Sequence, residues 1–480
     1  MKQLATIGAV VVLLLAAALF LGTKKQDTTT DPIGTPTVTA PHVDPTQPTT
    51  NANLPGTLTL KAAISNGQVL GGGTSDMYAS IDIQALKYQG AKRPPLNVAI
   101  VLDRSGSMAG EKFEQLQASA RRLIDVLTDD DRLALVSYGS DVSVDFASAQ
   151  MNTQNRARLR QAIDSMAVGG GTNLSGGFQH GYSEVSRWKR DDTVNRVILM
   201  SDGHANIGMT LPADLQRLAS TALEGGISVS SVGFGLDYNE DLMTLMANSG
   251  AGNYYFVDEA SAVATVFERE LTALAATVAR NTAVVIKLAP GVSVDHVFGF
   301  PARIDGNQVF ISMAEFRSEE MKSILAKLKL SAPTLGAAPV MDISLAYEDV
   351  LNNKPDLKMA TLSAVVTTDA AAARTASNVD VIARVQQVEV AQTMQDAMNL
   401  YSEGKADEAT RRIEETQQNM RERRKSYKFA DPSKFDRVDS ELDVLKGEVQ
   451  ARPASSVSGR TMVKSKKARS NAIMLDKSIF

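Results

Sequence analysis

Oxygen-bearing side chains gather at two points of the chain, each directly after a short apolar run. Asp103, Ser105 and Ser107 follow the first run in the pattern Asp-Arg-Ser-Gly-Ser-Met, and Asp202 follows the second in Ser-Asp-Gly. Carboxylate and hydroxyl oxygens are hard ligands, and a small set of them suits Mg²⁺, which keeps several of its waters. With two carboxylates at most among neutral hydroxyls, a coordination position that stays open would attract an external Glu or Asp. The residue types therefore predict a Mg²⁺ site, with Mn²⁺ or Ca²⁺ as alternatives, that attracts an external carboxylate.

The two apolar runs, 98–102 and 197–200, lie in a region where strand-like and helical patterns alternate from 94 to 279. Continuous apolar runs are typical of strands buried on both faces, and the intervening segments show helical spacing. This alternation predicts an α/β fold with a doubly wound, mainly parallel sheet. Ligand sites in such sheets form where loops leave the carboxyl ends of the strands, so Asp103 and Asp202 are expected at one rim.

The flanking regions have a different texture. Strand-like stretches occur in residues 57–93 and again in 280–370. The early strands are too few to be stable alone, so we expect them to pair with the later ones. The α/β domain would then be inserted in a β-sandwich. Residues 375–427 read as a helical hairpin, and residues 428–480 as a weakly structured basic tail.

The amino-terminal segment predicts a connection to a membrane. Residues 4–21 form an almost unbroken apolar run that just reaches the length of a bilayer span. Residues 1–25 are therefore read as an uncleaved anchor or as a signal peptide cleaved near 16–18, with a buried soluble helix as the third alternative. Lys2 and the pair Lys24–Lys25 flank the run on opposite sides and leave its orientation open. Residues 26–56 are rich in Thr and Pro and read as a linker. We expect a membrane-anchored protein facing the periplasm or the cell exterior, or a secreted one if the segment is cleaved.

The Asp-x-Ser-x-Ser motif resembles the signature of von Willebrand factor type A domains with a metal-ion-dependent adhesion site, of the bacterial membrane-associated type. In that family a threonine on a second loop and an aspartate on a third complete the site. Residues 169–174, Gly-Gly-Gly-Thr-Asn-Leu, resemble the threonine loop, and Ser-Asp-Gly resembles the aspartate motif. The resemblance covers roughly residues 96–279. It implies that Asp103, Ser105, Ser107, Thr172 and Asp202 hold the metal, with Asp103 acting through water and the three hydroxyls binding directly.

An ordinary structural role for these residues is the alternative. Ser and Asp are favoured at helix caps and turns, and Ser107 stands just ahead of a helical segment. Capping does not require all five positions, which favours the metal site. His204, next to the second aspartate motif, reads as a solvated loop residue rather than a ligand.

Several function classes are disfavoured by the sequence. The net charge of −4 argues against nucleic acid, and the absence of cysteine excludes thiolate chemistry. The glycine run 169–171 lacks the lysine of a phosphate-binding loop, so no nucleotide is expected. No catalytic triad or general base stands out, so we expect a binding protein rather than a metal-dependent hydrolase. Its partner would be a protein with an exposed Asp or Glu. The alternative is a structural or assembly factor of the cell envelope that acts through its sandwich and helical regions.

Overall fold

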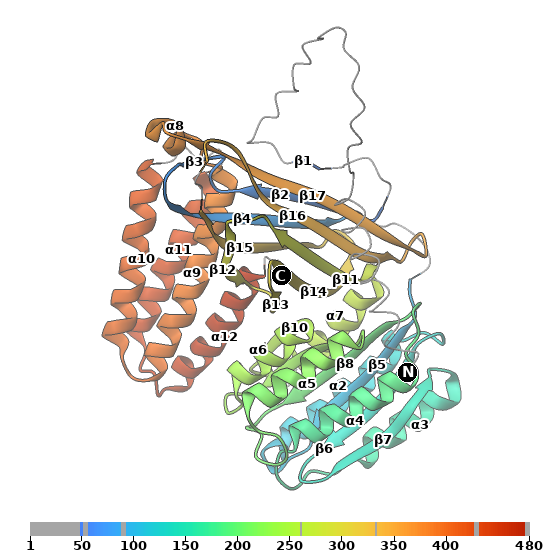
Figure 1. Cartoon of the computed structure of the whole chain (residues 1–480). Coiled ribbons are helices and arrows are strands. Elements are labelled where there is room, and N and C mark those ends of the chain that lie inside the picture. Colours follow the sequence, from blue (N-terminus) through green and yellow to red (C-terminus); the bar gives the residue numbers. More distant parts are fainter. Residues whose placement is uncertain are drawn as a thin grey trace, which may run out of the picture.

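The computed structural model describes residues 49–50, 56–87, 93–259, 262–331, 334–426 and 432–475 of the 480-residue chain. The described residues form a helix-covered sheet, a β-sandwich, and a helical bundle that lies beside the sandwich and reaches toward the helix-covered sheet (Figure 1). The apolar segment 4–21 and nearly all of the linker 26–56 lie outside the described residues. No helix within the described ranges is long and apolar enough to cross a membrane.

The helix-covered sheet has the strand order β10-β9-β8-β5-β6-β7. Its strands are β5 (Leu96–Asp103), β6 (Arg132–Tyr138), β7 (Val142–Gln150), β8 (Val194–Ser201), β9 (Ser228–Phe234) and β10 (Ala251–Val257). Only the pairing of β7 with β6 is antiparallel within this sheet. Every residue of β5 and of β8 is buried, as expected for strands that contain the apolar runs 98–102 and 197–200.

Helices cover both faces of this sheet, because β5 sends alternate side chains to opposite sides. Val98, Ile100 and Leu102 join the core under α2, α3 and α7, whereas Ala99 and Val101 join the core under α4, α5 and α6. The helices are α2 (Glu111–Val126), α3 (Thr153–Ser165), α4 (Leu174–Arg187), α5 (Pro212–Glu224), α6 (Glu240–Ser249) and α7 (Val263–Ala275). The predicted doubly wound α/β domain is confirmed.

The sandwich consists of strands from both sides of the α/β insertion. One sheet has the order β1-β17-β16-β11-β14-β13 with β3 beside β17, and the other has the order β12-β15-β4-β2. The early strands are β1 (Thr49–Thr50), β2 (Leu58–Ile64), β3 (Gln68–Leu70) and β4 (Thr74–Ala85). The later ones are β11 (Thr277–Leu288), β12 (Val292–Phe298), β13 (Ala302–Asp305), β14 (Gln308–Arg317), β15 (Met321–Ser331), β16 (Gly336–Asp349) and β17 (Lys354–Thr367). β4 pairs with β15 along its length, so the predicted insertion into a sandwich is confirmed.

The carboxyl-terminal part is a bundle, and the expected weakly structured tail is wrong for residues 432–475. The bundle helices are α9 (Val379–Ser402), α10 (Ala406–Ser426), α11 (Pro432–Ala451) and α12 (Val457–Met474), and the short α8 (Ala370–Thr375) before them lies against β3 of the sandwich. Leu442 and Leu445 of α11 and Met462 of α12 are buried against α9. Lys464 and Lys467, which suggested a solvated tail, are buried because they pair with carboxylates at the start of α6. α12 therefore links the bundle to the α/β domain.

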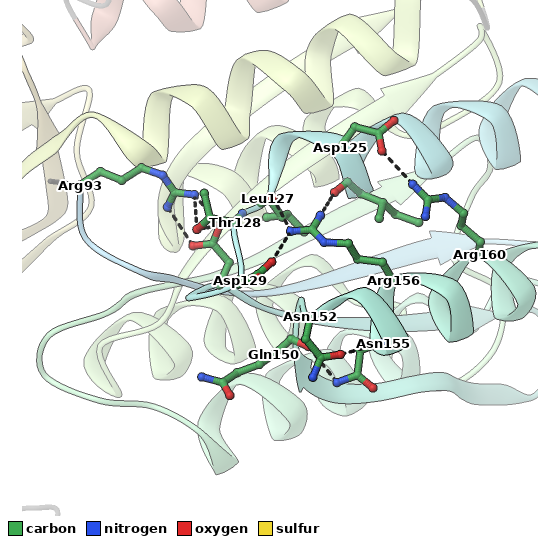
Figure 2. Close-up of polar contacts among 12 residues, drawn as sticks. Arg93, Asp125, Leu127, Thr128, Asp129, Gln150, Asn152, Asn155, Arg156 and Arg160 are labelled. Carbon is green, nitrogen blue, oxygen red and sulfur yellow. Dashed lines mark hydrogen bonds and ion pairs between the residues drawn. The ribbon is translucent and has the colours of Figure 1, made fainter. Parts of the chain in front are cut away.

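A polar network holds the amino ends of β5 and β6, at the edge opposite the predicted metal rim (Figure 2). Arg93 donates to Asp131 at 2.8 Å, and Asp131 also accepts from the backbone N–H groups of Leu96 and Thr128. Burial alone would raise the pKa of Asp131, but these hydrogen bonds lower it below its ordinary value. Arg156 donates to carbonyls at the end of α2. The network fixes where the chain enters the α/β domain.

Candidate metal centre

Asp103 is the last residue of β5 and is fully buried. One carboxylate oxygen accepts from the backbone N–H of Ser105 at 2.9 Å, and the other accepts from the hydroxyl of Ser201 at 2.8 Å. Burial raises the pKa of Asp103 and the charge of nearby Asp202 adds to the rise, while the hydrogen bonds from Ser105 and Ser201 oppose it. The carboxylate is thus held in one orientation beneath the loop that follows β5.

The two serines of the motif connect Asp103 to the second aspartate. The Ser105 and Ser107 hydroxyls are 3.1 Å apart, and Ser107 donates to Asp202 at 2.6 Å. Asp202 follows the last residue of β8 and is fully buried, whereas Ser107 is exposed. Because β5 and β8 are parallel neighbours, their carboxyl ends bring the two aspartates to one rim, as predicted.

Thr172 is carried to the same rim by the loop before α4. Backbone hydrogen bonds join this loop to residues 104–110, the serine loop. The Gly106 N–H donates to the Gly170 carbonyl, and the Gly169 N–H donates to the Arg104 carbonyl. The side chain of Asn206 accepts from the Thr172 backbone N–H at 2.8 Å. All five predicted residues therefore lie at the rim formed by loops 104–110, 169–173 and 202–211.

Gly203 keeps the space between the loops open. A β-carbon at Gly203 would lie 3.5 Å from the Ser107 hydroxyl and 3.7 Å from the Thr172 hydroxyl. Both hydroxyls thus face the same small space, next to the Asp202 carboxylate. A side chain at position 203 would point into this space.

The helix-capping alternative does not describe what these hydroxyls do. The cap residue of α2 is Gly110, without a side-chain cap, and Ser105 makes no side-chain cap on the short 3₁₀ turn Gly106–Met108. α4 is capped by Asn173, whose side chain accepts from Gly176. Only the bond from the Ser105 backbone to Asp103 resembles ordinary turn chemistry.

Sequence reasoning missed one charged residue of this rim. Lys112, in the first turn of α2, places its ammonium 2.8 Å from the second carboxylate oxygen of Asp202. The ammonium also lies 5.6 Å from the centroid of the Phe234 ring. The signal was available, since a helix that starts just after the motif must have its first turn at the rim. By contrast, His204 is exposed, as expected.

The candidate metal ligands at the rim are all oxygen atoms, and three of them are hydroxyls while two residues supply carboxylates. Across the described part of the chain, no group of three His, Cys, Asp or Glu side chains could hold a metal ion. Any ion at the rim would therefore depend on the hydroxyls of Ser105, Ser107 and Thr172 as well as on the two carboxylates. Hard oxygen donors of this kind match Mg²⁺, Mn²⁺ or Ca²⁺ and not a soft metal.

Comparison with known proteins identifies the family of the α/β domain. Residues 97–269 match the model of the von Willebrand factor type A domain. The chain is 29% identical over 212 residues to the Escherichia coli protein YfbK, covering 44% of this chain and 36% of that protein. It is 24% identical over 297 residues to sll0103 of Synechocystis, covering 60% and 70%. Human inter-alpha-trypsin inhibitor heavy chain H3 is 31% identical over 170 residues, 34% of this chain and 19% of that protein.

Solved structures share the whole fold. A von Willebrand factor type A protein from Catenulispora acidiphila superposes with a TM-score of 0.68 at 15% identity, covering 90% of this chain and 100% of that one. The ArnB paralog VWA2 from Sulfolobus acidocaldarius gives 0.60 at 17% identity, with coverages of 88% and 99%. The chain spans only 36% of the length of YfbK. It is a von Willebrand factor type A domain protein, related to bacterial YfbK and sll0103 and to the inter-alpha-trypsin inhibitor heavy chains.

Proposed function

We propose that the rim binds a divalent cation, Mg²⁺ before Mn²⁺ or Ca²⁺, and through it a carboxylate of a protein partner. A von Willebrand factor type A domain itself suggests a protein-binding or adhesion role. The observation that carries the metal proposal is the convergence of the Ser105, Ser107 and Thr172 hydroxyls with the Asp103 and Asp202 carboxylates around Gly203. When bound, the cation would supply a positive centre that a partner's Asp or Glu can reach from solvent.

The residues of the candidate site have distinct roles in this proposal. Ser107 is exposed and stands on the solvent side of the buried Asp202, so it would be the ligand nearest to a partner. Asp103 is buried at the end of β5 and orients the serine loop through the Ser105 backbone. Thr172 would complete the set from the second loop. The arrangement holds and orients an anion, which is the requirement for recognition.

We propose a binding role and not an enzymatic one. The charged neighbour of the rim is Lys112, which is paired with Asp202, and His204 is exposed on the loop next to it. Neither makes a hydrogen-bonded pair with a nucleophile of the kind that acyl or phosphoryl transfer needs. We propose neither nucleic acid nor a nucleotide as a partner.

The proposal places the protein at the cell envelope. The apolar segment 4–21 would anchor it in the membrane, and the Thr/Pro-rich linker would hold the folded body away from the surface, toward the periplasm or the cell exterior. If the segment is cleaved, the same body would be secreted. Protease protection of the folded body in intact cells tests this placement.

Calorimetric titration of the purified chain with Mn²⁺ tests the metal site. We expect wild type to bind the ion and Asp103→Ala to lose binding, because its buried carboxylate orients the loop. Asp129→Ala is the matched control, since this aspartate is on the same domain with its side chain 77% exposed. Asp129→Ala should bind as wild type does. Failure of wild type to bind Mn²⁺, Mg²⁺ or Ca²⁺ would refute the proposal.

The role in partner binding has its own measurement. Capture of an envelope protein should require a divalent cation, stop in EDTA, and be lost in Asp103→Ala but not in Asp129→Ala. Capture that survives both EDTA and Asp103→Ala would assign recognition to the sandwich and helical regions, as expected of an assembly factor.

A further inference from the structure

The Lys112 ammonium is built into the candidate metal centre. Its Nζ lies 2.8 Å from one oxygen of Asp202, while the other oxygen accepts the Ser107 hydroxyl at 2.6 Å. The Asp202 side chain is fully buried, and the Lys112 side chain is 35% exposed. One carboxylate is thus shared between a candidate metal ligand and a resident cation.

The lysine is held in this place by its surroundings. It stands in the first turn of α2, directly behind the serine loop, and its ammonium lies over the Phe234 ring. A β-carbon at Gly235 would lie 3.6 Å from the Lys112 Nζ, so the loop after β9 forms a wall on that side. Arg104, the cation within the motif itself, donates instead to the Asp141 carbonyl at 3.4 Å.

The charges of the rim lead to a definite expectation. Asp103 and Asp202 carry two negative charges when ionised, and Lys112 cancels one of them. A divalent cation would then leave the rim with one positive charge in excess. Without Lys112 the same ion would be neutralised by the two carboxylates alone. Charges this close, in a partly buried setting, interact strongly enough to change affinity by tenfold or more.

We propose that Lys112 couples metal binding to carboxylate binding, a step that rests on the proposed metal site. The excess positive charge weakens the hold of the rim on the ion when no partner is present. A partner carboxylate cancels that charge. The protein therefore binds the ion more tightly when the carboxylate is present, and binds the carboxylate more tightly when the ion is present. The lysine thereby makes a metal-dependent grip specific for an anionic partner.

Titration with Mn²⁺, with and without acetate as the carboxylate probe, tests this coupling. We expect wild type to bind Mn²⁺ weakly and to gain affinity with acetate. Lys112→Met should bind Mn²⁺ about tenfold more tightly without acetate and gain little from it, because the excess charge is gone. Lys112→Arg keeps the charge and should still respond to acetate. Lys287→Met, an exposed lysine on β11, should behave as wild type does.

A second variant and a second readout keep the outcome clear. If Lys112→Met folds poorly, Lys112→Gln takes its place, because glutamine can still donate a hydrogen bond to Asp202. It should then show the tighter Mn²⁺ binding and the small acetate response expected of Lys112→Met. In metal-free protein both variants should lower the melting temperature, and Mn²⁺ should restore it. Equal Mn²⁺ affinities and equal acetate responses in wild type and Lys112→Gln would overturn the coupling while leaving the metal site standing. Absence of Mn²⁺ binding in every variant would refute the site and the coupling together.

Discussion

Replacing Arg196 by methionine tests whether a buried charge network joins the α/β domain to the sandwich. Arg196 lies in β8 with its side chain fully buried, and it forms ion pairs with Glu270 of α7 and Glu315 of β14. Glu270 also accepts from Asn253 at 2.8 Å and from Tyr255 at 2.6 Å. Burial alone would raise the pKa of Glu270, but the Arg196 charge and these hydrogen bonds lower it below its ordinary value. The guanidinium therefore sits between an α/β helix and a sandwich strand.

The expected loss in the free energy of unfolding depends on the carboxylates that are left without a cation in Arg196→Met. Removing one partner of a buried ion pair costs about 3–5 kcal/mol, because the other charge stays buried without compensation. Two carboxylates would lose their cation, yet Glu270 keeps its neutral donors, so we expect about 3 kcal/mol from the lower end of that range. Arg190→Met is the matched control. Arg190 and Asp192 pair on the surface with side chains 68% and 48% exposed, and removing such a pair costs about 1 kcal/mol or less.

The assay is urea unfolding followed by the fluorescence of Trp188, the one tryptophan in the sequence, which lies at the end of α4. Its ring is stacked by the Arg132 guanidinium at 3.8 Å, so the signal reports the α/β domain. Adding Glu270→Gln to Arg196→Met should recover part of the lost stability, because it removes one orphaned charge. Equal midpoint shifts for Arg196→Met and Arg190→Met would refute the network. A double variant no better than the single one would assign the loss to packing instead.

The remaining predictions concern packing and the docking of α12. Gly181→Ala should destabilise the α/β domain by about 1–3 kcal/mol, since a β-carbon there would lie 2.4 Å from a methyl group of Val101; the same fluorescence measures it. Lys464→Met should increase hydrogen exchange in α12, because the buried Lys464 ammonium donates to the Tyr238 carbonyl at 2.8 Å and pairs with Glu240 at 2.7 Å. Acid should have the same effect on wild type. Burial would raise the pKa of Glu240, but Lys464 lowers it, so the pairing is complete above about pH 4.3 and is lost as pH falls through the lowered pKa. Lys464→Met should flatten this exchange–pH profile, and an unchanged profile would contradict the assignment.

The α/β domain and its rim could be predicted because their determinants are local. Continuous apolar runs such as 98–102 of β5 and 197–200 of β8 are typical of strands buried on both faces, and such strands occur in parallel sheets. The direction of a parallel strand then decides at which edge the following loop lies. Asp103 and Asp202 come directly after the apolar runs of such strands. Their proximity could therefore be predicted without knowledge of side-chain contacts.

The carboxyl-terminal helices could not be predicted in the same way, because their partners are distant in sequence. Lys464 and Lys467 give α12 a polar character that is typical of a solvated tail when the helix is considered alone. Their burial becomes favourable only next to Glu240 and Asp241, which precede them by more than two hundred residues. Lys112 was missed for a related reason. Its position in a helix is readable, but its long side chain crosses to a carboxylate on another loop.

One short loop connects the two features that sequence reasoning missed. Residues 235–239 begin at Gly235, beside the Lys112 ammonium, and end where α6 starts beneath α12. Within the loop Tyr238 is buried, its hydroxyl is 2.6 Å from that of Tyr254, and its carbonyl accepts from Lys464. A loop held at both ends and in its middle transmits displacement rather than absorbing it. We therefore expect deletion of the bundle to disturb the candidate metal rim as well as to remove the helical region that the assembly-factor alternative invokes. Point variants such as Lys464→Met and Lys112→Gln are needed to separate the two contributions.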